Sequence, residues 1–181
     1  MVGEAGDYGE LRALLRQQPC DVLVLDINLP GRSGLDVLHA LKEEASPIKV
    51  LIVSMYPEDQ YALRALRAGA YGYVNKGGDA AQIVAAVRTV AQGRKYVTPE
   101  MAQMLVENLT APVSEAAHEK LSDRELQTLV LIASGKRLAD IAEALTLSPK
   151  TVSVYRARVL EKLGLTNNSE MTVYAIRNEL V

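Results

Sequence analysis

The first half of the chain alternates short apolar runs with amphipathic stretches, and this alternation stops near residue 97. Apolar runs at residues 21–27, 49–55 and 71–75 are each followed by a stretch with helical spacing. Because strands that alternate with helices form parallel sheets, residues 1–97 are expected to form an α/β domain. The run at residues 21–27 is nearly unbroken, so we expect that strand to be buried on both faces.

The helices between these strands have recognisable caps and core faces. Ser33 can cap the first helix, a second helix is expected over residues 59–68 with Gly69 at its end, and a third is expected over residues 80–91. The first helix places Leu35, Leu38 and Leu41 on one face, and the third is expected to bury Ile83, Val84, Val87 and Val90.

Residues 98–120 are expected to link this domain to a second one. A short helix is predicted over residues 99–109, and residues 110–118 show no periodicity. From residue 121 to residue 181 only helical patterns remain, beginning with a capping box formed by Ser122 and Glu125. A later helix opens at Ser148-Pro149 and runs to Leu163 after a short turn, which predicts a helix-turn-helix. A plain bundle of three or four helices is the alternative.

Composition excludes several classes of protein. One cysteine and two histidines rule out an internal disulfide and a cysteine- or histidine-rich metal cluster. No apolar run approaches the ~18 residues that a membrane span needs, and the start lacks a signal-peptide pattern. We therefore expect a cytoplasmic protein that does not interact with membranes.

Charge is distributed unevenly along the chain. Residues 1–118 carry 11 basic and 14 acidic side chains, whereas residues 119–181 carry 9 and 8. Within residues 147–164 the basic side chains are Lys150, Arg156, Arg158 and Lys162, against one acid, Glu161. Such a basic stripe is typical of a surface that neutralises phosphates, although a solvated helix face gives the same pattern.

A carboxylate, a hydroxyl and an ammonium follow the ends of the three strands. They belong to Asp26, Ser54 and Lys76. Because the carboxyl ends of parallel strands share one edge, these groups should converge there, as a nucleophile, a hydrogen-bond donor and a neutralising cation for a phosphoryl group. The alternative is a purely stabilising pair between Asp26 and Lys76.

Three motifs in this half resemble the receiver domain of bacterial two-component response regulators. They are residues 26–34 (DINLPGRSG), Ser54 after a buried strand, and residues 69–76 (GAYGYVNK). The resemblance implies a flavodoxin-like parallel sheet in which Asp26 is the phospho-acceptor and Ser54, Tyr73 and Lys76 form the switch. It also implies Mg²⁺, held by Asp26 and the main chain of Asn28, and a sensor histidine kinase as partner.

The resemblance begins at the second strand of a receiver. The first strand and helix, and the acidic pair that binds magnesium, have no counterpart, and the missing strand would lie next to the one that carries Asp26. Glu4 and Asp7 are the only early acids that could replace the pair. With the pair missing, we expect phosphorylation of Asp26 to be slow or absent.

The helix over residues 149–163 has distinct inner and outer faces. Val152, Val159 and Leu163 should pack inward. Ser153, Val154 and Ala157 should point outward, where small or apolar side chains can meet base edges in a major groove. Side chains suited to phosphates are Lys150, Thr151, Tyr155, Arg156, Arg158 and Lys162.

The second half resembles the LuxR-type DNA-binding domain. The motifs are residues 121–126 (LSDREL), 140–145 (DIAEAL), 147–152 (LSPKTV) and 160–164 (LEKLG). Together with the receiver, they resemble the NarL/FixJ-type response regulators, and residues 169–177 are similar to the GacA/UvrY subgroup. The resemblance implies a homodimer on double-stranded DNA, for which the candidate pairing residues are Met171, Val173, Tyr174 and Ile176. These four residues could equally belong to the core of the domain itself.

The sequence therefore predicts a DNA-binding transcription factor regulated through Asp26, not an enzyme. Two alternatives remain open at this point. The first is a phosphorylation-independent DNA-binding or dimerisation protein whose receiver is only a docking surface. The second is a phosphatase-like enzyme with Asp26 as nucleophile, although Asn28 stands where a second acid would be required.

Overall fold

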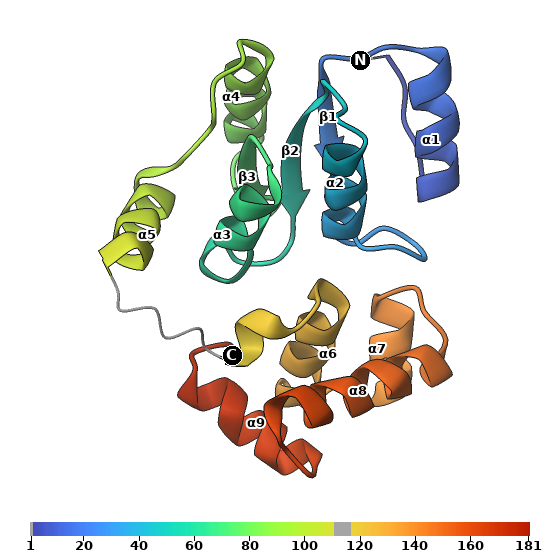
Figure 1. Cartoon of the computed structure of the whole chain (residues 1–181), viewed down its shortest axis with the longest axis vertical. Helices are drawn as coiled ribbons and strands as arrows, with labels where there is room; N and C mark the ends of the chain where they lie inside the picture. The colour runs from blue at the N-terminus through green and yellow to red at the C-terminus, as the bar shows by residue number, and fades with distance from the viewer. Residues whose placement is uncertain (1, 111–116) are drawn as a thin grey trace. The chain divides into compact units, whose positions relative to one another are not determined.

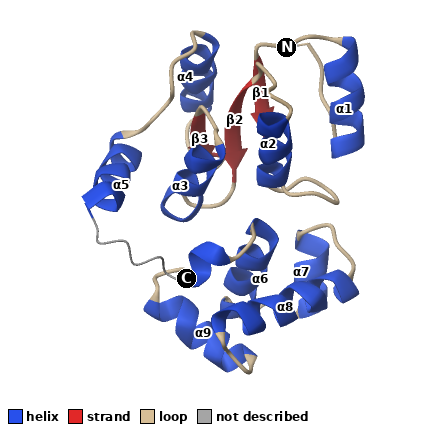
Figure 2. Cartoon of the chain, in the orientation of Figure 1, coloured by secondary structure: helices blue, strands red, loops and turns tan. Residues whose placement is uncertain are grey.

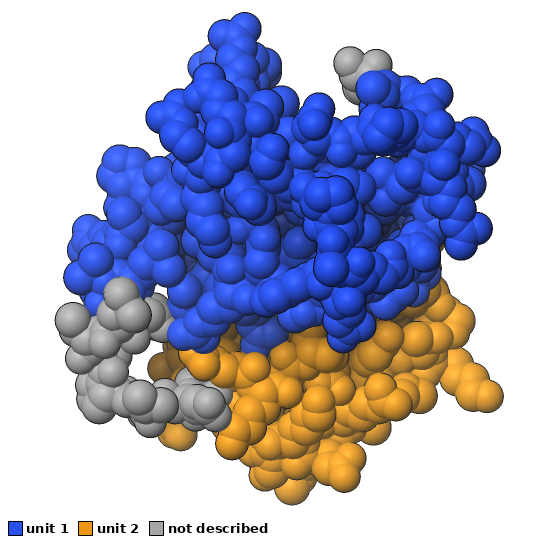
Figure 3. All heavy atoms as spheres, turned by 45° about the horizontal axis from the view of Figure 1, so that its top comes forward, with its two compact units in different colours: residues 1–112 blue, residues 113–181 orange. Residues whose placement is uncertain are grey.

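The computed structural model describes residues 2–110 and 117–181 (Figure 1). The chain forms two compact units, residues 1–112 and 113–181, which Figure 3 distinguishes by colour. The predicted linker stretch at residues 110–118 lies largely outside the described residues.

The first unit alternates helices with strands, as the sequence predicts. In chain order its elements are α1 (Tyr8–Gln17), β1 (Val22–Leu25), α2 (Gly34–Glu43), β2 (Lys49–Ser54), α3 (Glu58–Ala68), β3 (Gly72–Asn75), α4 (Ala80–Ala91) and α5 (Pro99–Thr110). Helix α5 contacts α3 and is therefore part of this unit. The expected α/β architecture is confirmed.

The three strands form a parallel sheet with the order β1-β2-β3 (Figure 2). Leu25 is in register with Ile52, which is in register with Tyr73, so the carboxyl ends of the strands lie along one edge. The prediction that β1 is buried on both faces is wrong, because the side chain of Val24 is 48% exposed. Among the described residues no strand covers the outer edge of β1, and this edge position leaves Val24 open.

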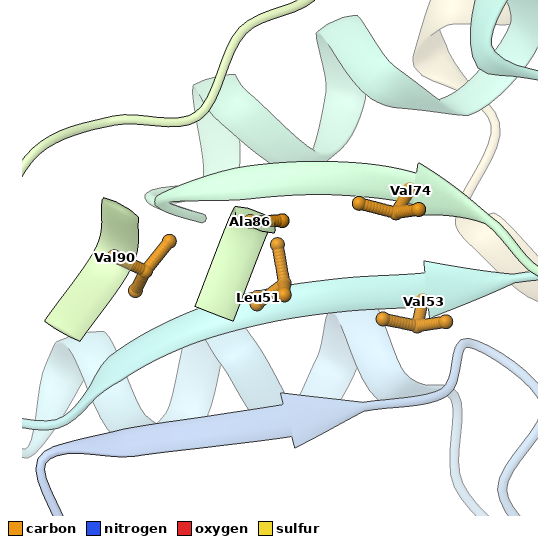
Figure 4. Packing of buried hydrophobic residues seen from close by; sticks show 5 residues of the cluster. All are labelled: Leu51, Val53, Val74, Ala86 and Val90. Carbon is orange, nitrogen blue, oxygen red and sulfur yellow. The ribbon is translucent and has the colours of Figure 1, made fainter. Parts of the chain in front are cut away.

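Helix α4 packs on the sheet and forms part of its core. Figure 4 shows Ala86 and Val90 of α4 with Leu51 and Val53 of β2 and Val74 of β3, all of them buried. The expected core face of this helix is wrong in one position, since Val84 is half exposed. The sheet contacts a narrower stripe of α4 than the apolar spacing indicates, and Ala86 occupies its centre.

The second unit is entirely helical in its described part. Its elements are the 3-10 helix η1 (Ala117–Lys120) and the α-helices α6 (Asp123–Ala133), α7 (Leu138–Ala144), α8 (Pro149–Leu163) and α9 (Asn168–Arg177). Helix α6 contacts α8 and α9, and α7 contacts α8. The core residues that these helices bury completely include Leu129, Ile141, Val152, Val159, Met171 and Ala175.

Caps predicted from the sequence fix the ends of α6 and α8. Ser122 and Glu125 form a reciprocal capping box at the start of α6. Ser148 accepts a hydrogen bond from the N–H of Thr151 at the start of α8, and Gly164 ends that helix in the left-handed conformation with φ 65°. A side chain at Gly164 would strain this backbone, which explains the glycine. None of the described helices has both the length and the apolar character required to cross a membrane.

Candidate functional site

Asp26 and Lys76 meet at the carboxyl edge of the sheet. Asp26 directly follows β1 and Lys76 directly follows β3, and Lys76 Nζ lies 2.6 Å from Asp26 Oδ2. The two side chains are 38% (Lys76) and 31% (Asp26) exposed, so the pair remains accessible to a reagent from solvent. The predicted convergence of these two residues is confirmed.

The loop after Asp26 folds back over the carboxylate. The N–H of Asn28 donates to Asp26 Oδ1 over 3.0 Å, so both carboxylate oxygens are oriented. The loop then approaches the main chain at Gly34, where a Cβ atom would lie 2.0 Å from the carbonyl oxygen of Asp26. Only glycine fits this close approach, which fixes the position of Asp26 relative to α2.

Ser54 is tied to Lys76 through the main chain. The N–H of Lys76 donates to the carbonyl oxygen of Ser54 over 2.8 Å. The Ser54 side chain is buried, and its Oγ accepts a hydrogen bond of 3.3 Å from the N–H of Tyr56. The three predicted groups therefore come from adjacent strand ends, with Lys76 as the residue that contacts both of the others.

Tyr73 is fully buried and directed inward. Its hydroxyl donates to the carbonyl oxygen of Tyr56 over 2.6 Å, and Asn75 Nδ2 donates to the same oxygen over 3.0 Å. Burial raises the pKa of Tyr73 far above its usual value. The carbonyl of Tyr56 is a functional group that sequence reasoning misses, because any residue type supplies a main-chain oxygen.

Receiver domains generally bind Mg²⁺ at their phosphorylation site. Three or more His, Cys, Asp or Glu side chains do not come together anywhere in residues 2–110 and 117–181 in a way that could hold a metal. Asp7, one of the two early acids, instead caps α1 by accepting from the N–H of Glu10. The described donor set at Asp26 therefore does not fit a magnesium site.

Helix α8 presents the face that its periodicity predicts. Val152 and Val159 are completely buried, whereas Ser153, Val154, Ala157 and Arg158 are exposed. Within the described parts of the chain, Lys150 and Arg158 form no ion pair, so their charges are available to a partner. An exposed helix face with small side chains between cations can enter a DNA groove.

Hydroxyl groups at the start of α8 are already engaged. Ser153 Oγ donates to the carbonyl oxygen of Pro149 over 3.0 Å, so it can only accept a hydrogen bond from a base. The hydroxyls of Ser148 and Thr151 share a hydrogen bond of 2.8 Å. Tyr155 is half-buried on the same helix.

Two of the predicted phosphate ligands have internal partners. Lys162 Nζ lies 2.6 Å from Glu125 Oε2 on α6, so the ammonium joins two helices of the domain. The assignment of Lys162 to DNA stays a prediction. Arg156 Nε donates to Asn168 Oδ1 over 2.6 Å. Since a guanidinium has further N–H groups, Arg156 keeps donors for a phosphate, whereas Lys162 is largely committed.

The candidate pairing residues of α9 lie in different environments. Met171 is completely buried, and half-buried Tyr174 accepts a hydrogen bond of 3.1 Å from the N–H of His118. Met171 is therefore a core residue of the domain, as the second interpretation of these residues expects, whereas the assignment of Tyr174 to a partner surface stays a prediction. Val173 and Ile176 are 48% and 59% exposed and remain candidates. The link between η1 and α9 through His118 is a contact that the sequence does not reveal.

The two units match two different protein families. Residues 1–88 match the family described as response regulator receiver domain, and residues 119–175 match the family described as bacterial regulatory proteins, luxR family. The matched segments include Asp26, Ser54, Tyr73 and Lys76 in the first unit and the whole of α8 in the second.

Relatives match the full length of the chain. The response regulator GacA of Pseudomonas aeruginosa is 35% identical over 100% of this chain and 85% of its own length. The response regulator UvrY of Escherichia coli K12 is 33% identical over 99% of this chain and 83% of its own length. A solved structure of two RcsB dimers bound to two parallel DNAs is 26% identical over 93% of this chain and 81% of that chain, with a TM-score of 0.51.

Proposed function

Since the chain belongs to the NarL/FixJ family of response regulators, which join a receiver to a LuxR-type DNA-binding domain, we propose that it is a transcription factor. It binds double-stranded DNA through α8 and is regulated by phosphorylation of Asp26. The proposed regulation by phosphorylation rests on the 2.6 Å contact between Lys76 Nζ and Asp26 Oδ2. The proposed DNA binding rests on the exposed outer face of α8.

Phosphorylation would change the charge at the edge of the sheet. A phosphoryl group on Asp26 carries about −1.5 to −2 charges near neutral pH. Lys76 is placed to neutralise part of that charge, because its ammonium already contacts Asp26 Oδ2. The main-chain bond from Lys76 to Ser54 would transmit any displacement of Lys76 to the end of β2.

Ser54 and Tyr73 are connected through the main chain of Tyr56. The N–H of Tyr56 donates to Ser54 Oγ, and its carbonyl accepts from Tyr73. We infer that rotation of the Ser54 side chain toward a phosphoryl oxygen would displace the main chain of Tyr56, and with its carbonyl the acceptor that holds Tyr73. This chain of contacts is the switch that we assign to the receiver.

The DNA contacts divide into positioning and recognition. Lys150, Arg156 and Arg158 would bind phosphates, with Thr151 and Tyr155 beside them. Val154 and Ala157 would contact base edges such as a thymine methyl, and Ser153 would accept a hydrogen bond from an exocyclic amine. Lys162 pairs with Glu125 and is therefore the least available of the predicted phosphate ligands.

A dimer is the expected form on DNA. The RcsB structure described above contains dimers on DNA, and two copies of a helix-turn-helix read two half-sites. Val173 and Ile176 are the exposed apolar side chains of α9 that would pair the domains. A sensor histidine kinase is the corresponding phosphodonor, since the chain contains a receiver.

Neither of the two alternative functions, a phosphorylation-independent DNA-binding protein or a phosphatase-like enzyme, is favoured. Matches over both the receiver and the DNA-binding domain argue against a docking surface without phosphorylation. The relatives are named as response regulators, which supports a regulator and not a phosphatase.

Phosphotransfer tests the input. The purified chain is incubated with acetyl phosphate and Mg²⁺, and its intact mass is measured. Because the magnesium-binding acids have no counterpart, we expect a slow gain of one phosphoryl group, which Asp26→Ala abolishes and Asp21→Ala, on the other end of the same strand, retains. No gain in the parent chain, or a gain that survives Asp26→Ala, would contradict the assignment of Asp26.

Binding to a pool of random DNA duplexes tests the output. We expect Arg158→Ala to weaken binding to all sequences. The slope of the logarithm of the binding constant against the logarithm of the salt concentration (the salt slope) should fall in magnitude by about 0.9, as for the loss of one phosphate contact. Arg88→Ala, an exposed arginine of α4, is the matched control and should leave the slope unchanged. An unchanged slope in Arg158→Ala would remove that residue from the interface.

A further inference from the structure

Asn168 joins the start of α9 to the proposed recognition helix α8. Its Oδ1 accepts a hydrogen bond from Arg156 Nε over 2.6 Å, although the two residues are 12 positions apart in the chain. An arginine side chain has donors only, so the side-chain oxygen of Asn168, and not its amide nitrogen, must face the guanidinium. The function proposed above gives Asn168 no part.

The helix ends around Asn168 hold it in place. Gly164 ends α8 in the left-handed conformation. Asn167 caps α9 by accepting from the N–H of Glu170 over 3.0 Å, so Asn168 is the first residue of that helix. The carbonyl oxygen of Asn168 accepts in turn from Thr172 Oγ1 over 3.1 Å. A residue whose main chain is held in this way can restrain the side chain that it binds.

The bond to Asn168 occupies only part of the Arg156 guanidinium. Nε supplies one of its several N–H groups, and the others belong to the two Nη atoms. Within the described residues these Nη atoms form no hydrogen bond or ion pair. One edge of a guanidinium can bind a phosphate through both Nη atoms at once. Asn168 therefore restrains the guanidinium and leaves this edge to a ligand.

The restraint does not reduce the charge of Arg156, because the amide of Asn168 is neutral. A carboxylate in its place would pair with the guanidinium and cancel the charge that attracts a phosphate. The acid in the first turn of α9 is Glu170, which accepts from the N–H of Thr166 over 2.7 Å and from its hydroxyl over 2.8 Å. Arg156 thus keeps its positive charge beside the start of α9.

A restrained arginine binds a phosphate at a lower entropic cost than a mobile one. A long side chain loses rotamer freedom when a ligand immobilises it, and a side chain that is already ordered loses less. Arg156 is half-buried and bonded to Asn168, whereas Arg158 is exposed. The two arginines of α8 therefore differ in how far they are prepared for a phosphate.

We propose that Asn168 is a positioning residue of the DNA interface, which acts through Arg156 by ordering its guanidinium for one backbone phosphate of double-stranded DNA. The proposal rests on the proposed DNA binding through α8 and adds a residue of α9 to that interface. A neutral side chain thereby raises affinity without adding a charge.

NMR relaxation of the arginine Nε–H groups tests the restraint in the full-length chain without DNA. We expect the Nε–H of Arg156 to be more rigid than that of Arg158 in the parent chain, and equally mobile in Asn168→Ala. Ser169→Ala changes the next exposed residue of the same turn and should leave Arg156 rigid. Equal mobility of the two arginines in the parent chain would overturn the proposal, whether or not the chain binds DNA.

A double-mutant cycle tests the effect on binding to the pool of random DNA duplexes. Asn168→Ala should weaken binding by about two- to tenfold, as for one hydrogen bond, and should leave the salt slope nearly unchanged because no cation is lost. In an Arg156→Ala background the same change should have no further effect. Equal losses in both backgrounds would show that Asn168 acts independently of Arg156, and no loss in either would show that the restraint plays no part in binding. Each of these results would refute the proposal.

Arg158→Ala separates failure of this proposal from failure of the proposed function. If Arg158→Ala weakens binding while Arg156→Ala and Asn168→Ala do not, α8 binds DNA without the Arg156–Asn168 pair, and only the role of Asn168 is overturned. If none of the three variants changes binding, the assignment of α8 to DNA fails as well.

Discussion

Lys162 Nζ of α8 lies 2.6 Å from Glu125 Oε2 of α6. The same carboxylate oxygen accepts a hydrogen bond of 2.7 Å from the N–H of Ser122, so one group closes the capping box of α6 and holds the last turn of the proposed recognition helix. This contact links α8 to α6.

Removing Lys162 should therefore affect stability more than DNA binding. Lys162→Ala leaves the Glu125 carboxylate, whose side chain is 3% exposed, without its cation, and we expect a loss of about 1–3 kcal/mol in the free energy of unfolding. Arg158→Ala removes one cation from the same helix and should leave stability nearly unchanged. Urea denaturation of both variants measures the difference, and equal stabilities would contradict the role of the pair.

The Glu125 pair also predicts a pH dependence. Burial acts to raise the pKa of Glu125, but hydrogen bonds from Lys162 and from the Ser122 N–H outweigh it and hold the pKa below its usual 4.5. The contribution to stability is therefore fully present above pH 4.5 and is lost as the pH falls through the lower pKa of the folded state.

Denaturation of the parent chain and of Glu125→Gln at several pH values measures this contribution. The stability difference between the two proteins should be constant near neutral pH and should shrink below pH 4.5. A difference that does not change with pH in this range would show that the carboxylate charge plays no part.

The hydroxyl of Tyr73 should contribute to the stability of the receiver. Tyr73→Phe keeps the buried ring but leaves the carbonyl of Tyr56 with the Asn75 amide as its remaining described donor, and we expect a loss of about 1 kcal/mol. Tyr71→Phe, on the residue just before β3, is the control and should have little effect. Thermal unfolding compares the two, and equal melting temperatures would argue against the bond.

The exposed apolar face of α9 should determine self-association of the DNA-binding domain. Ile176→Asp places a charge on a side chain that is 59% exposed, and we expect it to abolish dimer formation on DNA without unfolding the domain. Ser169→Asp adds the same charge to the first turn of the same helix, where it is favourable. Analytical ultracentrifugation with a DNA duplex separates the species, and a dimer that survives Ile176→Asp would exclude this face.

The sequence predicts the elements and the fold class correctly because both depend on patterns over short stretches. Apolar runs and helical spacing predict β1 to β3, α3 to α5 and α8 to within a few residues. Caps at Ser33, Ser122 and Ser148 are equally local, since the hydroxyl bonds a main-chain N–H two or three residues on. The meeting of Asp26 with Lys76 follows from the parallel sheet.

Errors in the sequence interpretation concern residues whose environment is set by distant segments. Val24 and Val84 are apolar and fit their patterns, but nothing described covers the outer edge of β1, and the sheet covers only part of α4. Met171, one of the candidate pairing residues, is buried inside the domain. Hydrophobic spacing specifies one face of an element and not what packs against it.

What the sequence by itself determined is the order of strands and helices, the residues at the strand ends and the face that α8 turns outward, because periodicity and local hydrogen bonds specify these within a few turns of chain. Only the tertiary structure decided which charges are free. Lys162 and Arg158 are indistinguishable as cations of one helix, but Glu125 lies 37 residues away and reaches only Lys162. Which side chains meet across such separations is fixed by the packing of whole elements, and that packing leaves the side chain of Arg158 exposed.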